Sequence, residues 1–252
     1  GPYISKLKRG IHNPNVIREP LLKEVEEYIQ ISENKIKIIT LAPELEGATD
    51  FISSLAKYGV ILSVGHSNAT YAETMKGIEK GISYATHTFN AMRGLHHRES
   101  GPLGAILIEK GVYAEIIADG IHVSPEVIRL LVKAKGIDGI ILVTDACEGA
   151  GLAEGEYLFN GEKIIVKSDQ AVTENNILAG SIITMDLTIK NMLNFTKEPL
   201  KNVLKMATYN PAKVLGIEQE RGHLAKGKIA DILLLDKDLR VKMIFKNGTK
   251  NG

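Results

Sequence analysis

Three apolar, strand-like runs in this chain each end on a side chain that can bind a metal or carry a proton. Residues 60–64 lead through Gly65 to His66, residues 84–86 lead to His87, and residues 139–144 lead to Asp145. Near-continuous apolar runs of this length are typical of parallel strands, because such strands are buried on both faces. In a barrel of alternating strands and helices, catalytic side chains collect where the strands end. The pattern therefore indicates an α/β fold with its chemistry at one edge of the sheet.

Strand-like and helix-like segments alternate along most of the chain, which is typical of a parallel sheet with helices outside it. We expect strands over residues 36–41, 60–64, 84–86, 113–118 and 139–144, which makes five strand–helix units up to Asp145. We expect helices over residues 49–58, 71–80, 125–135, 182–195 and 200–207, a loop over 93–104, and a hairpin from 156–159 and 163–166. Residues 232–235 and 241–246 predict two short strands joined by a polar turn. A closed (β/α)₈ barrel has eight strands, so the fold is either an open sheet or a barrel whose first strands lie outside this sequence.

The composition excludes several classes of function. Among 252 residues, 31 Lys and Arg nearly balance 30 Asp and Glu, and no block of like charge suggests binding to nucleic acid or an anionic membrane. No apolar run approaches the ~20 residues of a membrane-spanning helix. The single cysteine, Cys147, forms no disulfide within the chain, and the start does not resemble a signal peptide, so we expect a cytoplasmic protein. The expected partner is therefore a small molecule.

The two histidines predict a metal site. If their strands are neighbours, the residues that end them lie about 4.8 Å apart, and both imidazoles can reach one ion of the Zn²⁺ type. Asp145 is open to three interpretations: a third ligand, a general base, or a group that orients another residue. Glu44, just past the first strand, is either a ligand or a surface carboxylate. Cys147 is a soft ligand type, although a small buried residue is the more common role.

Other polar side chains follow strands or lie in loops where they could bind a substrate anion or polarise a carbonyl. His122 follows the fourth strand, and His12 lies in an early loop. His96, His97 and Arg98 form a basic cluster that is either an anion site or a solvated loop. Residues 178–181 place small side chains before a helix, where backbone amides can approach a ligand closely.

Six motifs, in this order, resemble the N-acetylglucosamine-6-phosphate deacetylases of the amidohydrolase superfamily. They are GHSNAT at 65–70, THTFNAM at 86–92, ADGIH at 118–122, LVTDA at 142–146, LAGS at 178–181 and NPAKVLG at 210–216. The opening GPYISKLKRGIHNP resembles the same family, so the resemblance covers essentially the whole chain. It implies that residues 1–222 are a (β/α)₈ TIM-type barrel lacking its first strands. Residues 223–252 would then be the C-terminal strands of a small β-sandwich domain.

The resemblance also implies a reaction, in which acetate is removed from N-acetylglucosamine 6-phosphate to give glucosamine 6-phosphate in amino-sugar catabolism. Such enzymes are usually homodimers. His66 and His87 become ligands of a divalent metal ion, with Zn, Fe, Mn and Co all candidates. Asp145 becomes the general acid/base, which takes a proton from the attacking water and then protonates the departing amine. The implied substrate contacts are His12, Asn90, Ala91, Arg98, His122, Ala179, Gly180 and Ser181.

One metal ligand of the family has no counterpart in this sequence. That ligand is a glutamate directly before a Gly-Pro pair, and the sequence given starts at Gly1 and Pro2. Glu44 matches a different family position. We therefore expect these 252 residues to hold a metal poorly and to be inactive by themselves. Two alternatives are a different amidohydrolase, acting on a related acetylated sugar or a cyclic amide, and a non-catalytic relic of the fold.

Overall fold

The computed structural model describes residues 1–159 and 161–251, and its centre is a five-stranded parallel sheet. All neighbouring strands pair in parallel, in the order of the chain. The strands are β1 (Ile38–Leu41), β2 (Ile61–Val64), β3 (Ile82–Ala85), β4 (Tyr113–Ile117) and β5 (Ile140–Val143). The five predicted strands are confirmed, and their order brings the ends of β2 and β3 side by side.

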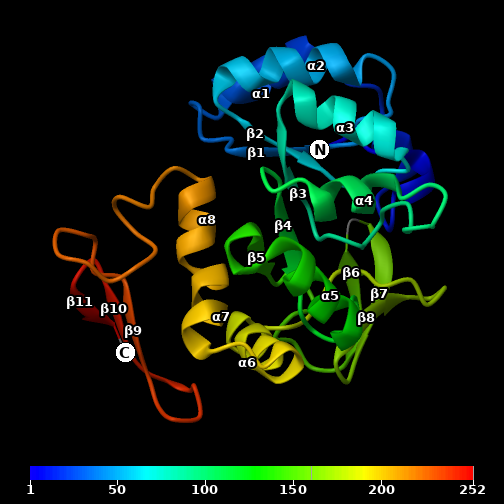
Figure 1. Ribbon diagram of the computed structural model, residues 1–252. Coiled ribbons are helices and arrows are strands. Elements are labelled where there is room, and N and C mark those ends of the chain that lie inside the picture. Colours follow the sequence, from blue (N-terminus) through cyan, green and yellow to red (C-terminus); the bar gives the residue numbers. More distant parts are fainter. Residues whose placement is uncertain (160, 252) are drawn as a thin grey trace.

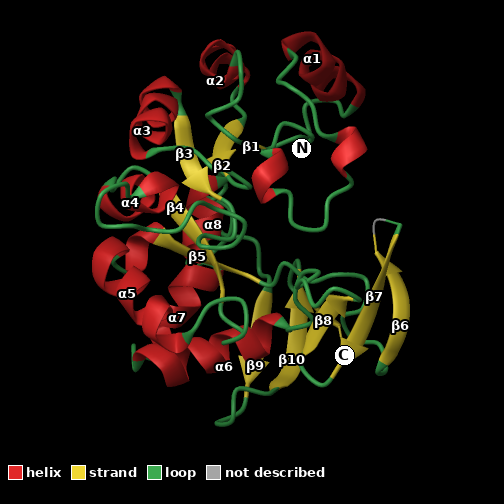
Figure 2. Cartoon of the chain, turned by 90° about the vertical axis from the view of Figure 1, so that its right-hand side faces the viewer, coloured by secondary structure: helices red, strands yellow, loops and turns green. Residues whose placement is uncertain are grey.

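Helices cover one face of this sheet and form an arc outside the strands (Figure 2). The helices that follow the first four strands in turn are α2 (Ala48–Leu55), α3 (Tyr71–Lys80), α4 (Gly101–Ile108) and α5 (Pro125–Lys135). The chain later adds α6 (Met185–Thr196), α7 (Leu200–Ala207) and α8 (Tyr209–Val214), and α1 (Leu22–Ile31) precedes β1. None of the helices in the described part of the chain is long and apolar enough to cross a membrane.

The predicted loop over residues 93–104 was wrong at its end, because α4 begins at Gly101. Six of the eight residues of α4 are buried, from Gly101 to Ile106. A helix buried nearly all round lacks the alternation of apolar and polar faces by which surface helices are recognised. This helix therefore escaped a prediction that depended on periodicity.

One hydrophobic core joins the parallel sheet to its helices. Leu62 and Ile116 from the strands and Ile52, Ile106 and Ile128 from the helices are completely buried in it. Most strand residues are apolar, and the two histidines and the aspartate predicted to carry the chemistry stand in the loops at the strand ends. The core thus fixes the sheet edge from which the candidate site is built.

Asn210, in α8, ties that helix to the sheet through two buried hydrogen bonds. Asn210 is only 1% exposed, and its Nδ2 donates to the carbonyl oxygens of Ile137 at 2.8 Å and Ile140 at 2.7 Å. We expect Asn210→Ala to lower the free energy of unfolding by about 2–3 kcal/mol, because two buried carbonyls lose their donor. Urea denaturation measures this change.

Asn202→Ala in α7 is the matched control. The Asn202 side chain is half-buried and donates to the Glu198 carboxylate, just before the start of α7. We therefore expect the free energy of unfolding to fall by less than ~1 kcal/mol. Equal losses in the two variants would contradict the bridging role of Asn210.

After β5 the chain leaves the parallel sheet for a three-stranded antiparallel sheet. Its strands are β6 (Gly155–Phe159), β7 (Glu162–Lys167) and β8 (Gln170–Thr173). The predicted hairpin is confirmed by β6 and β7, and β8 is an additional strand. Cys147 packs with Ile164 and Val166 in a small core of its own, which agrees with its interpretation as a buried residue. This sheet carries residues 159 and 178 towards the ends of the parallel strands.

A second antiparallel sheet, at the C-terminal end, lies apart from the parallel sheet (Figure 1). It contains β9 (Ile232–Leu235), β10 (Val241–Lys246) and β11 (Thr249–Asn251). The two predicted strands are confirmed, and β11 extends the sheet. Leu233 and Leu234 are both exposed, although successive strand residues point to opposite faces. The sheet therefore leaves apolar side chains uncovered on both of its faces.

Candidate active site

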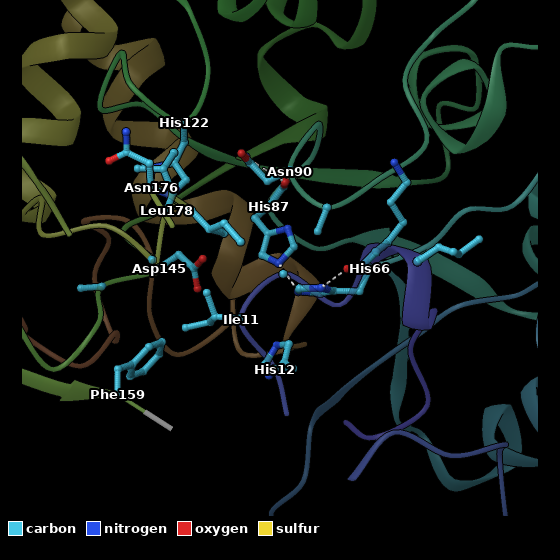
Figure 3. Close-up of a pocket in the computed structure, with 17 residues that line it drawn as sticks. Ile11, His12, His66, His87, Asn90, His122, Asp145, Phe159, Asn176 and Leu178 are labelled. Atoms are coloured by element: carbon cyan, nitrogen blue, oxygen red, sulfur yellow. Dashed lines mark hydrogen bonds between the residues drawn. The ribbon is translucent and has the colours of Figure 1, made fainter. Parts of the chain in front are cut away.

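His66 and His87 follow β2 and β3, and their rings meet at the ends of these strands (Figure 3). The two Nε2 atoms lie 3.0 Å apart. Both residues have positive φ, 48° for His66 and 31° for His87, a region that L residues seldom adopt. Strained backbone of this kind is concentrated at functional sites, so the geometry supports the predicted pairing of the two histidines.

Gly65 allows the strand ends to approach closely enough for this pairing. A Cβ at position 65 would lie 2.7 Å from Thr40 Cγ2 and 2.9 Å from Thr86 Cβ. Thr86 Oγ1 also forms hydrogen bonds with Ser63 Oγ at 2.6 Å and Thr40 Oγ1 at 2.8 Å. A side chain other than hydrogen would push apart three strand ends that these hydroxyls hold together, which explains the glycine before His66.

The ring of His66 is fixed in the orientation and protonation state that a metal ligand needs. Its Nδ1 lies 2.8 Å from the carbonyl oxygen of Lys8, which can only accept, so Nδ1 carries the hydrogen and Nε2 keeps its lone pair. Burial, with His87 nearby, lowers the pKa of His66 to about 3. The imidazole is therefore neutral at physiological pH, the form in which histidine ligates a metal.

The backbone of His87 is held by Glu115, a residue that the sequence analysis did not single out. The amide of His87 donates to Glu115 Oε2 at 3.0 Å, from the middle of β4. Burial raises the pKa of the Glu115 carboxyl. A signal for it was present in the sequence, because Glu115 is the one charged residue in the apolar strand 113–117.

The histidine pair fits one divalent metal ion. Two nitrogens that each lie ~2.0–2.1 Å from the same ion are about 3 Å apart, as the two Nε2 atoms are. Within residues 1–159 and 161–251, no cluster of three or more His, Cys, Asp or Glu completes such a site. Glu44 instead accepts hydrogen bonds from Ser67 Oγ at 2.8 Å and from the Asn68 amide at 2.6 Å, which braces the loop after His66.

A cavity of about 540 Å³ opens beside the histidine pair. Asp145, which also has positive φ, turns its carboxylate into this cavity between Ile11 and Leu178 (Figure 3). The predicted site residues that line the cavity are His12, His66, His87, Asn90, Ala91, His122, Asp145 and Gly180. Residues from at least five loops thus converge on one site, as expected for the carboxyl ends of parallel strands.

His12 lies directly beside the histidine pair. Its ring meets that of His66 edge-on, with centroids 4.9 Å apart. Burial lowers the pKa of His12, which keeps the ring neutral and able to donate one hydrogen bond. The position suits a contact with a group bound between the two histidines and Asp145.

Three of the predicted substrate contacts do not line the cavity. Arg98 is exposed on its loop, with Nη1 3.0 Å from Nε2 of His97. Ala179 and Ser181 are buried behind the cavity wall. The Ser181 amide donates to the Asp145 carbonyl at 2.8 Å, and its hydroxyl donates to the Thr144 carbonyl. Ser181 thus supports the strand end that carries Asp145, whereas the Ala179 amide donates to the Ala171 carbonyl in β8. The role of both residues as sugar contacts stays a prediction.

The apolar wall of the cavity was not predicted. Ile11, Phe159 and Leu178 come from segments far apart in the sequence and meet only here. Figure 3 shows them around the Asp145 carboxylate. No local pattern marks such residues, because their position depends on how the β6–β8 sheet folds back over the strand ends.

The sequence profile of the Amidohydrolase family matches residues 12–251. The chain belongs to the amidohydrolase family. Among curated proteins it is 37% identical over 248 residues to the N-acetylglucosamine-6-phosphate deacetylase of Lysinibacillus sphaericus, covering 98% of this chain and 64% of the relative. It is 36% identical to the N-acetylgalactosamine-6-phosphate deacetylase of Escherichia coli O157:H7, covering 98% of this chain and 66% of that protein. The chain therefore spans about two-thirds of the length of these relatives.

Solved structures of amidohydrolases share the fold. A mutant of N-acetyl-D-glucosamine-6-phosphate deacetylase from Mycobacterium smegmatis, in complex with N-acetyl-D-glucosamine-6-phosphate, superposes with a TM-score of 0.95 at 33% identity. The match covers 99% of this chain and 66% of that structure. The observed arrangement of sheet and helices is thus the arrangement of this amidohydrolase, over the part that the chain spans.

Proposed function

We propose that this amidohydrolase removes the acetyl group from N-acetylglucosamine 6-phosphate, which gives glucosamine 6-phosphate and acetate. The observation that carries the proposal is the convergence of His66, His87 and Asp145 on one cavity. The names of the similar proteins support this substrate class. The galactosamine epimer is a second candidate, because a relative of nearly equal identity is named for it. Both substrates share the acetamide and the 6-phosphate, and release of acetate from each tests the proposal.

We propose that residues 1–222 form part of a (β/α)₈ barrel. Five parallel strands with helices on one face account for five of its eight units. Residues 223–252 then belong to a small β domain whose other strands cover the exposed apolar side chains of β9 and β10. A homodimer, as the family resemblance implies, is part of the same proposal.

We propose that His66 and His87 hold a divalent metal ion, with Zn, Fe, Mn and Co as candidates. When bound, such an ion supplies positive charge that polarises the acetyl carbonyl and makes water more acidic. The two Nε2 atoms lie 3.0 Å apart, and the Lys8 carbonyl orients the ring of His66 so that its Nε2 faces the ion. Two ligands hold a metal weakly, so we expect activity only where a further ligand, a carboxylate by the family resemblance, completes the site.

Asp145 is the proposed proton carrier. Its carboxylate faces the cavity, where it can accept a proton from the attacking water and return it to the amine nitrogen as the C–N bond breaks. His12 is placed to donate a hydrogen bond to the acetyl oxygen, beside His66. Ile11, Phe159 and Leu178 give the cavity an apolar wall beside this carboxylate.

Arg98 lies on an exposed loop outside the cavity, and it is the proposed phosphate contact because of the family resemblance; it gives a test of substrate class. We expect Arg98→Ala to raise KM for N-acetylglucosamine 6-phosphate by roughly 10- to 100-fold, because a charge-assisted hydrogen bond to phosphate is lost. The same variant should leave the weak turnover of unphosphorylated N-acetylglucosamine nearly unchanged. Steady-state kinetics with both sugars measures the difference.

Arg129→Ala is the control, since Arg129 is an exposed arginine of α5, outside the cavity, that bonds only Glu126 and the Phe195 carbonyl in the described structure. It should change neither KM value. An equal loss on both sugars in Arg98→Ala would show that Arg98 does not act on the phosphate.

A further inference from the structure

Asp119 and His122 form a closed pair in the turn after β4. Each side chain is only 6% exposed, and Asp119 Oδ2 lies 2.6 Å from His122 Nδ1. The other carboxylate oxygen, Oδ1, accepts the backbone amides of Ile121 and His122, both at 2.8 Å. Both oxygens of one carboxylate are therefore committed to this turn, and the imidazole cannot rotate without breaking its bond to Asp119.

The turn itself is held by the fold. Gly120 adopts φ 79°, and a Cβ at this position would lie 3.1 Å from Phe195 Cζ in α6. Asn191, also in α6, donates to the Ala118 carbonyl at 3.0 Å. The orientation of the Asp119–His122 pair is thus set by packing against α6, before any ligand enters the cavity.

This geometry determines which ring nitrogen of His122 carries the proton. Burial acts to raise the pKa of Asp119, but the hydrogen bonds from His122 and the backbone amides outweigh it and lower that pKa. The ionised carboxylate can only accept, so Nδ1 of His122 is the donor. Among residues 1–159 and 161–251, no group bonds the other nitrogen, Nε2, and His122 lines the cavity. In the neutral ring, Nε2 is therefore a hydrogen-bond acceptor available to a ligand.

We propose that Asp119 is a positioning residue that makes His122 Nε2 an acceptor for a hydroxyl group of the bound sugar. This inference rests on the proposed function, which places an amino sugar in the cavity. Asn176 and Leu178 lie beside His122 (Figure 3), and neither forms a hydrogen bond with its Nε2 in the described structure. A sugar hydroxyl donates to such a nitrogen, whereas a fully ionised phosphate has no hydrogen to donate. His122 thus contacts a hydroxyl of the sugar ring rather than the phosphate.

Asp119→Asn tests the proposal because it reverses the proton position with little change of shape. The asparagine Oδ1 still accepts the two backbone amides, while Nδ2 donates to His122 Nδ1. The ring proton then moves to Nε2, which becomes a donor facing the sugar hydroxyl. In the full-length enzyme we expect KM to rise by roughly 10- to 100-fold, with kcat changed by less than about 3-fold. Nitrogen-15 NMR of the histidines should show Nδ1–H in the unmodified enzyme and Nε2–H in Asp119→Asn.

Asp138→Asn is the matched control, since Asp138 is exposed and pairs only with Lys205 in the described structure. It should alter neither the His122 signals nor KM. An Nε2–H tautomer in the unmodified enzyme overturns the proposal without any variant. A KM that stays constant while the proton moves overturns the sugar contact. The NMR measurement does not depend on turnover. It therefore decides whether Asp119 sets the tautomer of His122 even if the proposed reaction is not observed.

Discussion

In the full-length enzyme, Asp145→Asn should reduce the kcat of acetate release from N-acetylglucosamine 6-phosphate by roughly 10²- to 10⁴-fold, the range for loss of a general acid/base. Asparagine has nearly the same shape but cannot take a proton from water. Because the cavity walls remain in place, we expect binding of glucosamine 6-phosphate to change by only a few-fold. A stopped assay of acetate measures the change in kcat, and calorimetric titration with glucosamine 6-phosphate measures the change in product binding.

The metal content of Asp145→Asn separates the interpretations that the sequence left open. An acid/base role predicts unchanged metal in the variant, whereas a role as third ligand predicts its loss. Glu148→Gln, three residues along in the same exposed loop, is the matched control and should retain activity. Near-normal turnover in Asp145→Asn would show that Asp145 is not the general acid/base.

His87→Ala should remove the metal and the activity together. Outer-sphere partners of metal ligands alone contribute 10- to 100-fold in affinity, so we expect loss of a direct ligand to weaken metal binding by more than ~100-fold. In the full-length enzyme, the metal content measured by elemental analysis after dialysis should fall from about one ion per chain to near zero, and kcat should fall in proportion. The buried position of His87, with Nδ1 lacking a partner among the described residues, indicates that its role is not structural bonding.

His96→Ala gives the comparison for His87→Ala. His96 is an exposed histidine that stacks on His97, outside the cavity. The His96→Ala variant should retain its metal and its activity. A full metal content in His87→Ala would place the ion elsewhere and contradict the proposed site.

The fold could be predicted from sequence wherever one local pattern decided the structure. α3 was predicted with its exact bounds, because Thr70 and Glu73 form a capping box at its start and Gly81 ends it. α1 was missed although Val25 and Ile29, four residues apart, mark its buried face. α4 offered no such stripe, since it is buried nearly all round. Short β8 and β11 complete sheets whose first two strands alone carried a readable pattern.

The site was predictable only as far as strand order fixes it. Consecutive strands placed His66 next to His87, so their meeting followed from the sequence. The positions of Phe159 and Leu178 depend on the β6–β8 sheet folding over the strand ends, which no local pattern encodes. Arg98 was assigned by resemblance, yet its loop holds it on the surface, outside this cavity.

We propose that this site hydrolyses the acetamide of an amino-sugar 6-phosphate with a metal held by His66 and His87. The most direct test of this proposal is the quantity of acetate and glucosamine 6-phosphate formed from N-acetylglucosamine 6-phosphate by the full-length, metal-loaded enzyme. We expect equal amounts of both products, formed at least about 100-fold faster than by Asp145→Asn. No acetate from this substrate or from its galactosamine epimer, at full metal content, would contradict it.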